Sequence, residues 1–342
     1  MKALYYEELN GYRGIKTGDV PVPETTENEV LVRVKAFSLN HLDVWVMDGK
    51  YPVQVPLPHV FGSDASGIIE KVGKNIQHIR AGDEVIVFPG LSCGHCDRCM
   101  SGHDNECKDF SILGVKNNGV SAEYVSVPAS NIFKKPEGLS FEEAAGIGVT
   151  YTTSWNSLVL RGGIRQGDTI LIHSAGSGVG TALIQVAKLY NATIITTVGD
   201  EWKIQKAKEL GADFVINHQK EDFSEAVKRI TKGDLVDIAV DHVGVATFNK
   251  SLSCLKKGGR IVTFGATSGD EVPLSLRYIF GKNISLHGIY VGPKAAVQEY
   301  LRLFPHRLKT VVDSVFKFAD AQKAYEKLLS RQFFGKIVVK IW

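Results

Sequence analysis

The feature that most constrains the fold is an alternation of short apolar segments with helical segments that begins near residue 140. Residues 169–173, 193–198, 236–241, 260–264 and 284–291 read as strands, and residues 179–190 and 203–210 between them read as helices. Near-continuous apolar strands separated by helices predict a parallel sheet covered on both faces. The sequence therefore predicts an α/β fold with a doubly wound parallel sheet in this region.

The chain before this region has a different pattern, with short predicted strands and little predicted helix. Residues 29–36 alternate apolar and polar side chains around Val30, Val32 and Val34, which is the period-two pattern of a half-buried strand. Residues 67–73, 83–87 and 122–128 read as further short strands between turn signals. We expect a mostly β region here, then a helix opened by the capping pair Ser140 and Glu143. After Pro293, we expect a helix at 319–331 and a last strand at 336–341.

A glycine-rich turn joins the strand at 169–173 to the helix that follows it. Small residues let a backbone approach a pyrophosphate, and a helix N-terminus offers unpaired N–H groups to its oxygens. A purely structural turn is the alternative, but the strand–turn–helix context favours a dinucleotide site. The residues predicted to contact the cofactor are Ala175, Gly176, Ser177, Gly178, Val179 and Gly180.

The end of the next strand bears on the choice between NAD and NADP. If the strand ends at Val198, no carboxylate meets the adenosine ribose, and Gly199 and Lys203 leave room for a 2′-phosphate. If the turn is shifted, Asp200 faces the ribose and repels that phosphate. Both readings stay open, and we favour NADP(H) over NAD(H).

Four of the five cysteines lie within 15 residues, at Cys93, Cys96, Cys99 and Cys107. Four thiolates at this spacing can close a tetrahedron around zinc and leave no open coordination position. The expectation is one structural zinc per chain, with tight turns at Gly94 and Gly102. A nucleic-acid-binding zinc ribbon is the competing interpretation, and the acidic residues between the cysteines disfavour it.

Composition narrows the function classes. Forty basic and 37 acidic residues among 342 leave a net charge of +3, which gives no reason to expect nucleic acid or an anionic membrane as a partner. No apolar run has the length of a membrane-spanning helix, and residues 1–8 lack the pattern of a signal peptide. We expect a cytoplasmic protein that acts on a small molecule.

Taken together, these motifs resemble those of the medium-chain dehydrogenase/reductase superfamily. The resemblance covers essentially the whole chain and also includes Pro58-x3-Gly62-x4-Gly67, Gly82-Asp83-x-Val85, and the segments 207–213 and 335–338. It implies a GroES-like catalytic domain from residues 1–148 and 293–342, with a zinc lobe at 90–110, and a Rossmann domain at 149–292. It also implies cofactor contacts from Val243, Gly265 and Lys336, and a homodimer or homotetramer paired through the strand at 284–291.

The catalytic zinc site of alcohol dehydrogenases in this superfamily is not matched. Asn40 stands where the family has its early cysteine, Ser63 and Asp64 replace the His-Glu pair, and Val149 falls at the later cysteine. The chain therefore resembles the zinc-free quinone and enoyl reductase branch. Asn40, Ser63 and Asp64 are the candidate catalytic residues, together with Tyr51 in a Gly-x-Tyr-Pro stretch as a proton donor.

Three functions stay open from the sequence. The first is a reductase without catalytic zinc, transferring hydride from NAD(P)H to a quinone, a conjugated C=C or a small carbonyl, because a conjugated acceptor spreads the developing charge itself. The second is an alcohol dehydrogenase without a catalytic metal or with a non-standard one held by His41, His59 and Asp64. The third is a dinucleotide-binding protein without turnover.

Overall fold

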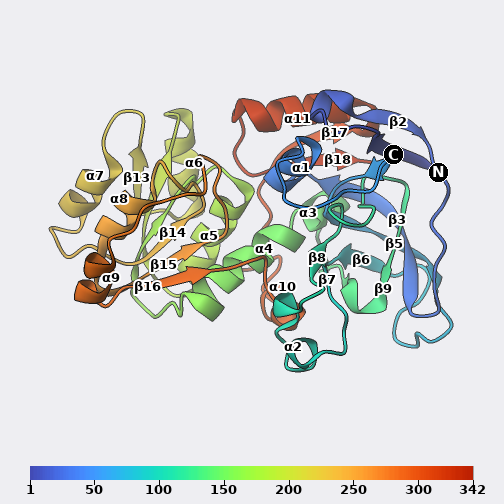
Figure 1. Ribbon diagram of the computed structural model, residues 1–342, viewed down its shortest axis with the longest axis horizontal. Coiled ribbons are helices and arrows are strands. Elements are labelled where there is room, and N and C mark those ends of the chain that lie inside the picture. The colour runs from blue at the N-terminus through green and yellow to red at the C-terminus, as the bar shows by residue number, and fades with distance from the viewer. Residues whose placement is uncertain (342) are drawn as a thin grey trace. The chain divides into compact units, whose positions relative to one another are not determined.

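A computed structural model describes residues 1–341 of the chain (Figure 1). The chain divides into two compact units, one formed by Met1–Val149 with the segment from Pro293 onward, the other by Thr150–Gly292. Each unit has its own sheet and its own buried core, and they are described in turn.

The second unit contains the predicted parallel sheet. Its six strands pair in the order β13-β12-β11-β14-β15-β16, and every neighbouring pair is parallel. The strands are β11 (Thr169–Ile172), β12 (Thr193–Val198), β13 (Phe214–Asn217), β14 (Val236–Asp241), β15 (Leu255–Thr263) and β16 (Ser285–Gly288). The order reverses between β11 and β14, which is the switch point of a doubly wound fold, so the predicted fold class is confirmed.

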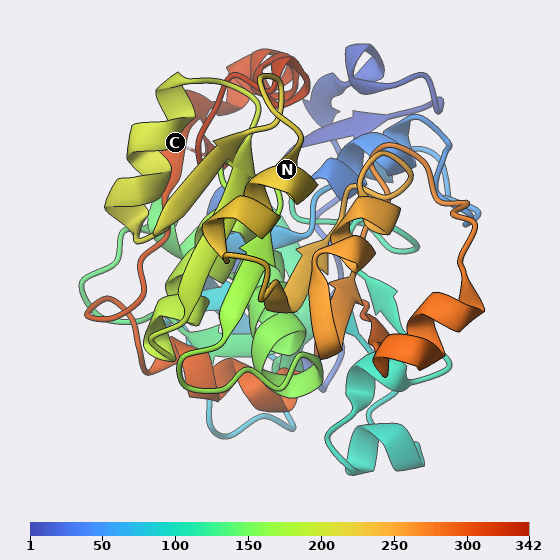
Figure 2. The same ribbon diagram turned by 90° about the vertical axis from the view of Figure 1, so that its left-hand side faces the viewer.

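Helices cover this sheet (Figures 1 and 2). They are α5 (Gly178–Leu189), α6 (Trp202–Leu210), α7 (Phe223–Ile230), α8 (Phe248–Ser253) and α9 (Leu276–Lys282). Helix α4 (Gly148–Trp155), followed by a π-helical segment at Asn156–Arg161, precedes the first strand of this sheet in the chain. Side chains of α7, α8 and α9 share one apolar cluster against the sheet, and α5 contacts α6. Right-handed crossovers place α5 and α6 on the opposite face. Helices α5 and α6 were predicted from the sequence, whereas α7, α8, α9 and strand β13 were not.

The first unit is mostly β, as expected. Its largest sheet has the order β10-β6-β5-β3-β18-β17, with β9 paired to β3, and smaller sheets join β2-β1-β4 and β7-β8. The strands are β1 (Lys2–Tyr6), β2 (Lys16–Asp19), β3 (Glu29–Ser38), β4 (His59–Val60), β5 (Asp64–Val72), β6 (Glu84–Val87), β7 (Gly90–Leu91), β8 (Ser111–Ile112), β9 (Tyr124–Pro128), β10 (Ile132–Lys134), β17 (Val312–Lys317) and β18 (Lys336–Lys340). Strand β18 pairs antiparallel with β3, so segments about 300 residues apart in the chain lie side by side in this sheet.

Short helices complete the first unit: α1 (His41–Met47), α2 (Asp97–Met100), α3 (Phe141–Ala145), α10 (Val297–Leu301) and α11 (Ala321–Ser330). The predicted capping pair opens α3, where the Glu143 backbone N–H donates to Ser140 Oγ at 3.1 Å and Ser140 N–H donates to the Glu143 carboxylate at 2.8 Å. Among residues 1–341, no helix combines the length and apolar character needed to span a bilayer.

Candidate functional site

The four clustered cysteines converge around β7, α2 and β8. The Sγ atoms of Cys93 and Cys107 are 3.6 Å apart, those of Cys96 and Cys99 3.5 Å, and those of Cys93 and Cys99 3.8 Å. A tetrahedron with Zn–S bonds of about 2.3 Å has sulfur atoms roughly 3.8 Å apart, so the cluster matches the size of a four-thiolate zinc site. Within residues 1–341, these are the only His, Cys, Asp or Glu side chains whose ligand atoms converge in a group of three or more.

The backbone prepares these thiols to bind a cation. Gly94 and Gly102 adopt φ values of +78° and +79°, which allow the tight turns expected between the ligands. Backbone N–H groups of His95 and Cys96 point at the Cys93 sulfur and lower the pKa of that thiol to about 6. Because the thiolate is the ligand form, this geometry favours metal binding at neutral pH.

A closed network of three polar side chains lies at the ends of β5, β3 and β18. Asp64 is fully buried, and its Oδ2 accepts hydrogen bonds from Asn40 Nδ2 at 2.9 Å and from the Lys336 ammonium at 3.2 Å. Lys336 also donates to Asn40 Oδ1 and to the Leu39 carbonyl oxygen, both at 2.8 Å. We call Asn40, Asp64 and Lys336 the ion-pair network.

The remaining carboxylate oxygen of Asp64 is also engaged. Val149 donates its backbone N–H to Asp64 Oδ1 at 2.7 Å. The carboxylate lies so close to the backbone of Gly148 that a Cβ at that position would collide with Oδ1. The local chain therefore has a glycine where a larger residue would expel Asp64 from its pocket.

Lys336 was predicted to contact the cofactor, which stays a prediction, and in the structure its ammonium is paired within the protein. Its three ammonium hydrogens match three protein acceptors, and its side chain is only 5% exposed. A buried ammonium must be fully paired because burial without partners is costly. Asn40, in contrast, is half-buried, and among residues 1–341 only Asp64 accepts from its Nδ2, which leaves one N–H without a protein acceptor.

The other two candidate catalytic residues are placed differently. The Ser63 hydroxyl is buried and donates to the Leu113 carbonyl oxygen at 2.9 Å, so its hydrogen is held by the backbone rather than offered to an acceptor. Tyr51 is half-buried in the loop after α1, where its backbone N–H donates to the Trp45 carbonyl at 3.2 Å. Its role as a proton donor stays a prediction.

The structure does not gather the alternative metal ligands. His59 lies in β4, where its Nε2 pairs with the Gly114 carbonyl at 3.0 Å. His41 begins α1, and its ring packs edge-on against Trp45. Both oxygens of Asp64 already accept hydrogen bonds from the protein. The donor set of His41, His59 and Asp64 therefore does not fit a catalytic metal here.

Asp43, a buried carboxyl next to Asn40, was not among the site residues predicted from the sequence. Asp43 Oδ2 accepts from the Asn40 backbone N–H at 2.8 Å and from the Tyr325 hydroxyl at 3.0 Å. Burial raises the pKa of Asp43 to about 7, against the opposing effect of these hydrogen bonds. The Asn-x-x-Asp spacing is a capping signal that could have identified this carboxyl, but its partner Tyr325 is remote in sequence.

In the second unit, the glycine turn opens α5 as predicted. Ser177 is the N-cap, and its Oγ accepts from the Gly180 backbone N–H at 2.9 Å. The adjoining strand end is close, because Ala175 N–H donates to the Thr197 carbonyl at 2.9 Å. A twelve-residue helix with unpaired N–H groups at its start can bind a phosphate.

The other predicted cofactor contacts lie at the same carboxyl edge of the sheet. Strand β12 ends at Val198, and the Asp200 carboxylate after it lies 3.4 Å from Lys203 Nζ. Val243 follows β14 and Gly265 follows β15, and the two loops are joined where Ser268 N–H donates to the Val243 carbonyl at 2.8 Å. Because parallel strands share one carboxyl edge, these loops and the glycine turn lie along the same edge of the sheet, which is where α/β folds of this type bind ligands.

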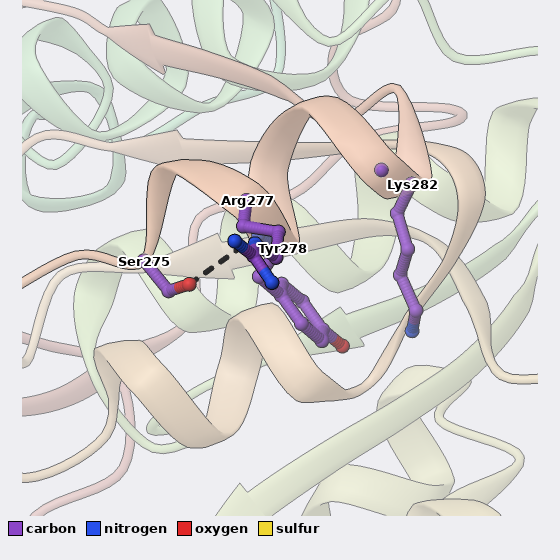
Figure 3. Close-up of a pocket in the computed structure, with 5 residues that line it drawn as sticks. Ser275, Arg277, Tyr278 and Lys282 are labelled. Carbon is purple, nitrogen blue, oxygen red and sulfur yellow. Dashed lines mark hydrogen bonds between the residues drawn. The ribbon is translucent and has the colours of Figure 1, made fainter.

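A shallow surface hollow of about 350 Å³ lies over α9 (Figure 3). Its lining comes from Ser275, Arg277, Tyr278, Gly281 and Lys282. Ser275 Oγ caps the helix by accepting from Tyr278 N–H at 3.3 Å, and Lys282 Nζ donates to the Leu255 carbonyl at 2.9 Å. None of these residues is a predicted site residue, and the hollow has no cluster of nucleophiles or carboxylates.

Two family models match the chain. The model described as alcohol dehydrogenase GroES-like domain matches residues 26–137, and the model described as zinc-binding dehydrogenase matches residues 178–305. The GroES-like model falls on the β-rich part of the first unit, and the zinc-binding dehydrogenase model falls mainly on the second unit. Both matches agree with the predicted combination of a GroES-like and a Rossmann domain.

Similar proteins carry several activities in their names. An alcohol dehydrogenase of Geobacillus stearothermophilus is 31% identical over 100% of both chains, and an acryloyl-coenzyme A reductase of Sulfurisphaera tokodaii is 31% identical over 96% of this chain and 97% of that protein. A crystal structure of an NAD-dependent alcohol dehydrogenase aligns with a TM-score of 0.96 and 42% identity over 100% of both chains.

Proposed function

Because the chain belongs to the medium-chain dehydrogenase/reductase superfamily and is thereby an NAD(P)-dependent oxidoreductase, we propose that it is a reductase that works without a catalytic zinc. Its acceptor in this proposal is a conjugated C=C bond, a quinone or a small activated carbonyl. NAD(P)H, once bound, supplies the hydride.

The ion-pair network carries this proposal. The superfamily's zinc ligands correspond to Asn40, Ser63 and Val149, and these offer an amide, a hydroxyl bonded to backbone and an aliphatic side chain. Asp64 is joined to Lys336 and Asn40 within the protein. An ammonium and a carboxylate thus satisfy each other at this position, and no set of thiolate or imidazole ligands remains for zinc.

The residues here suit an acceptor that stabilises its own charge. Hydride addition to the β-carbon of a conjugated carbonyl moves the C=C electron pair toward oxygen, which gains negative charge, and a proton then adds at the α-carbon. The unpaired N–H of Asn40 can donate a hydrogen bond to that oxygen. One neutral donor is weaker than a Lewis-acid metal, which favours conjugated acceptors over saturated alcohols.

Alcohol oxidation is the second candidate. The names of two similar proteins support it, since the Geobacillus relative and the structure at 42% identity are both alcohol dehydrogenases. The acryloyl-coenzyme A reductase has the same percent identity to this chain as the Geobacillus relative, 31%, and its name supports the first candidate.

Substrate and metal assays together separate the two candidates. We expect NAD(P)H oxidation with a quinone or a short enoyl thioester, one zinc per chain by elemental analysis, and little oxidation of simple alcohols. Asn40→Ala should lower kcat by about a hundredfold, while Asn75→Ala, which removes an exposed amide, leaves it unchanged. Two zinc ions per chain, with alcohol oxidation that a chelator abolishes and zinc restores, would overturn the proposal.

For the cofactor, we propose NADP(H). Strand β12 ends at Val198 without a carboxylate, and the nearby Asp200 is paired with Lys203, which reduces its repulsion of a 2′-phosphate. The name of the NAD-dependent relative supports the other choice. Direct titration with NADPH and NADH decides between them.

For the cysteine cluster, we propose one structural zinc per chain. It supports a loop with little regular structure of its own, because only short elements lie around the four ligands. The four thiols must stay reduced to bind the ion, so we place the protein in the cytoplasm, where thiols are kept reduced.

We also propose that the protein forms a homodimer or homotetramer through β16 and α9. Strand β16 is at one end of its sheet, so one of its edges has no partner strand within the described chain. On α9, Leu276 and Phe280 lie one helical turn apart and are 73% and 69% exposed. Pairing with a second copy would cover both the open edge and these apolar side chains.

A further inference from the structure

Four buried polar side chains form a line beneath the glycine turn. Thr197 Oγ1 lies 3.2 Å from His173 Nδ1, and His173 Nε2 lies 2.8 Å from Ser251 Oγ. Ser251 in turn donates to Asp241 Oδ2 at 2.7 Å. Each of these residues is at most 2% exposed, and they come from β12, the end of β11, α8 and β14.

The hydrogen-bond directions in this line are determined. Ser251 has one hydroxyl hydrogen and gives it to Asp241, so its oxygen must accept from His173 Nε2–H. With the proton on Nε2, a neutral imidazole accepts at Nδ1, and the Thr197 hydroxyl donates to it. Burial lowers the pKa of His173 despite the attraction of Asp241, which agrees with a neutral ring.

Both ends of the line hold backbone N–H groups of loops at the carboxyl edge. Thr197 Oγ1 accepts from Ser174 N–H at 3.1 Å, and Ser174, the first residue of the glycine turn, has φ of +56°. Asp241 Oδ1 accepts from the N–H groups of Val243 and Gly244 at 3.0 and 3.1 Å. The same chain of hydrogen bonds therefore reaches two loops on opposite sides of the switch point.

We propose that Thr197, His173, Ser251 and Asp241 are positioning residues that fix the glycine turn and the 243–244 loop in the spacing required to bind the dinucleotide. The inference rests on the proposed function, because that proposal assigns NAD(P)H as the ligand bound at the carboxyl edge of the parallel sheet. The left-handed Ser174 gives it a physical reason: a non-glycine residue in that conformation is strained and needs local hydrogen bonds to hold it. We call these four residues the relay. Because they connect β12, β11 and β14, a change at one loop is transmitted to the other through their hydrogen bonds.

Ser251→Ala tests the relay because it leaves both loop contacts intact. Thr197 still bonds Ser174, and Asp241 still bonds the 243–244 loop, so a binding defect must pass through the relay. We expect Ser251→Ala and Thr197→Val each to raise the NADPH dissociation constant about tenfold, as measured by nucleotide fluorescence on the full chain. Thr197→Ser, which keeps the hydroxyl, should retain the wild-type constant.

The double variant distinguishes a relay from separate local effects. If both changes interrupt one chain of hydrogen bonds, Ser251→Ala with Thr197→Val should also raise the constant about tenfold rather than a hundredfold. Ser253→Ala on the same helix, where the hydroxyl donates to the Lys250 carbonyl at 2.6 Å and not to any of the four residues of the relay, is the matched control and should have no effect.

Several outcomes would overturn the relay. A folded Ser251→Ala protein with the wild-type dissociation constant would do so, and so would a double variant whose effect is the product of the single effects. Should Ser251→Ala fail to fold, His173→Gln, which can keep the donor toward Ser251 but lose the acceptor toward Thr197, is measured in its place with the same expected tenfold change. A wild-type protein that binds neither NADPH nor NADH would refute the proposed function itself.

Discussion

Replacing Lys336 with methionine removes the ammonium from the ion-pair network and keeps an unbranched apolar side chain of similar length. The Asp64 carboxylate, which is fully buried, then loses its only cationic partner among residues 1–341. Removing one member of a buried ion pair costs about 3–5 kcal/mol because the remaining charge is left without compensation. Domains of 150–250 residues lose roughly 2–4 °C of melting temperature per kcal/mol, so we expect a drop of roughly 6–20 °C.

Calorimetric melting of three variants measures this effect. The double variant Lys336→Met with Asp64→Asn has no buried charge, so it should recover most of the loss. Lys74→Met removes an ion pair with Glu27 in which both side chains are more than half exposed, and it should melt close to wild type. The same concentrations and buffer are needed throughout, because ligand binding and assembly shift melting temperatures.

Two results would refute the reasoning about the network. Lys336→Met could melt within about 2 °C of wild type, which would mean that the buried pair contributes little. Alternatively, the double variant could be less stable than Lys336→Met, which would mean that the loss comes from packing or hydrogen-bond geometry rather than from an uncompensated charge.

Four further predictions concern other parts of the molecule. The folded-state pKa of Asp43 is raised from 3.8 to about 7, so the free energy of unfolding should fall as pH rises from about 4 to 7, by at most about 1.4 kcal/mol per pH unit. Urea titrations at pH 5 and 7.5 should show this fall in the wild type and not in Asp43→Asn. The same pH dependence in both proteins would contradict the prediction. Lys203→Met should weaken NADPH binding about tenfold and leave NADH binding unchanged. An equal loss of affinity for both nucleotides would show that Lys203 does not bind the 2′-phosphate. If two copies pair through β16 and α9 as proposed, Leu276→Glu with Phe280→Glu should give smaller species than the wild type in sedimentation, and an unchanged mass would contradict that interface. Cys93→Ser should bind less than one zinc per chain and melt at a lower temperature, and a full zinc content would exclude Cys93 as a ligand.

The elements that could be predicted from the sequence are those with a local signal. The apolar runs of β11, β12 and β14 and the turn at Gly176 identify a parallel sheet because neighbouring residues alone determine the period. The spacing of the cysteines likewise limits where their sulfurs can lie, and the structure places them at zinc-site distances. Strand β13, at Phe214–Asn217, was missed because it has only four residues and immediately follows an Ala-Asp pair without a clear pattern.

Side chains whose roles depend on a partner far away in the sequence could not be predicted. Nothing near Lys336 indicates that its ammonium is buried beside Asp64, 272 residues away. His173 reads as one more residue of an apolar strand until Ser251 and Asp241 are placed next to it. The departures from the superfamily's zinc-ligand pattern could be predicted from the sequence, but the hydrogen-bond partners of Asn40, Ser63 and Asp64 could not, because tertiary packing determines them.

The pairing of β18 with β3 bears on how the chain acquires its structure during synthesis. The parallel sheet is made from one uninterrupted segment, so it can form while the rest of the polypeptide is still being translated. The largest sheet of the first unit stays incomplete until the ribosome has delivered β17 and β18. Until then residues 36–38 of β3, which lie beyond the part paired with β9, have no partner on that edge, and Asp64 lacks the Lys336 ammonium. This part of the nascent chain is therefore open to pairing with other strands.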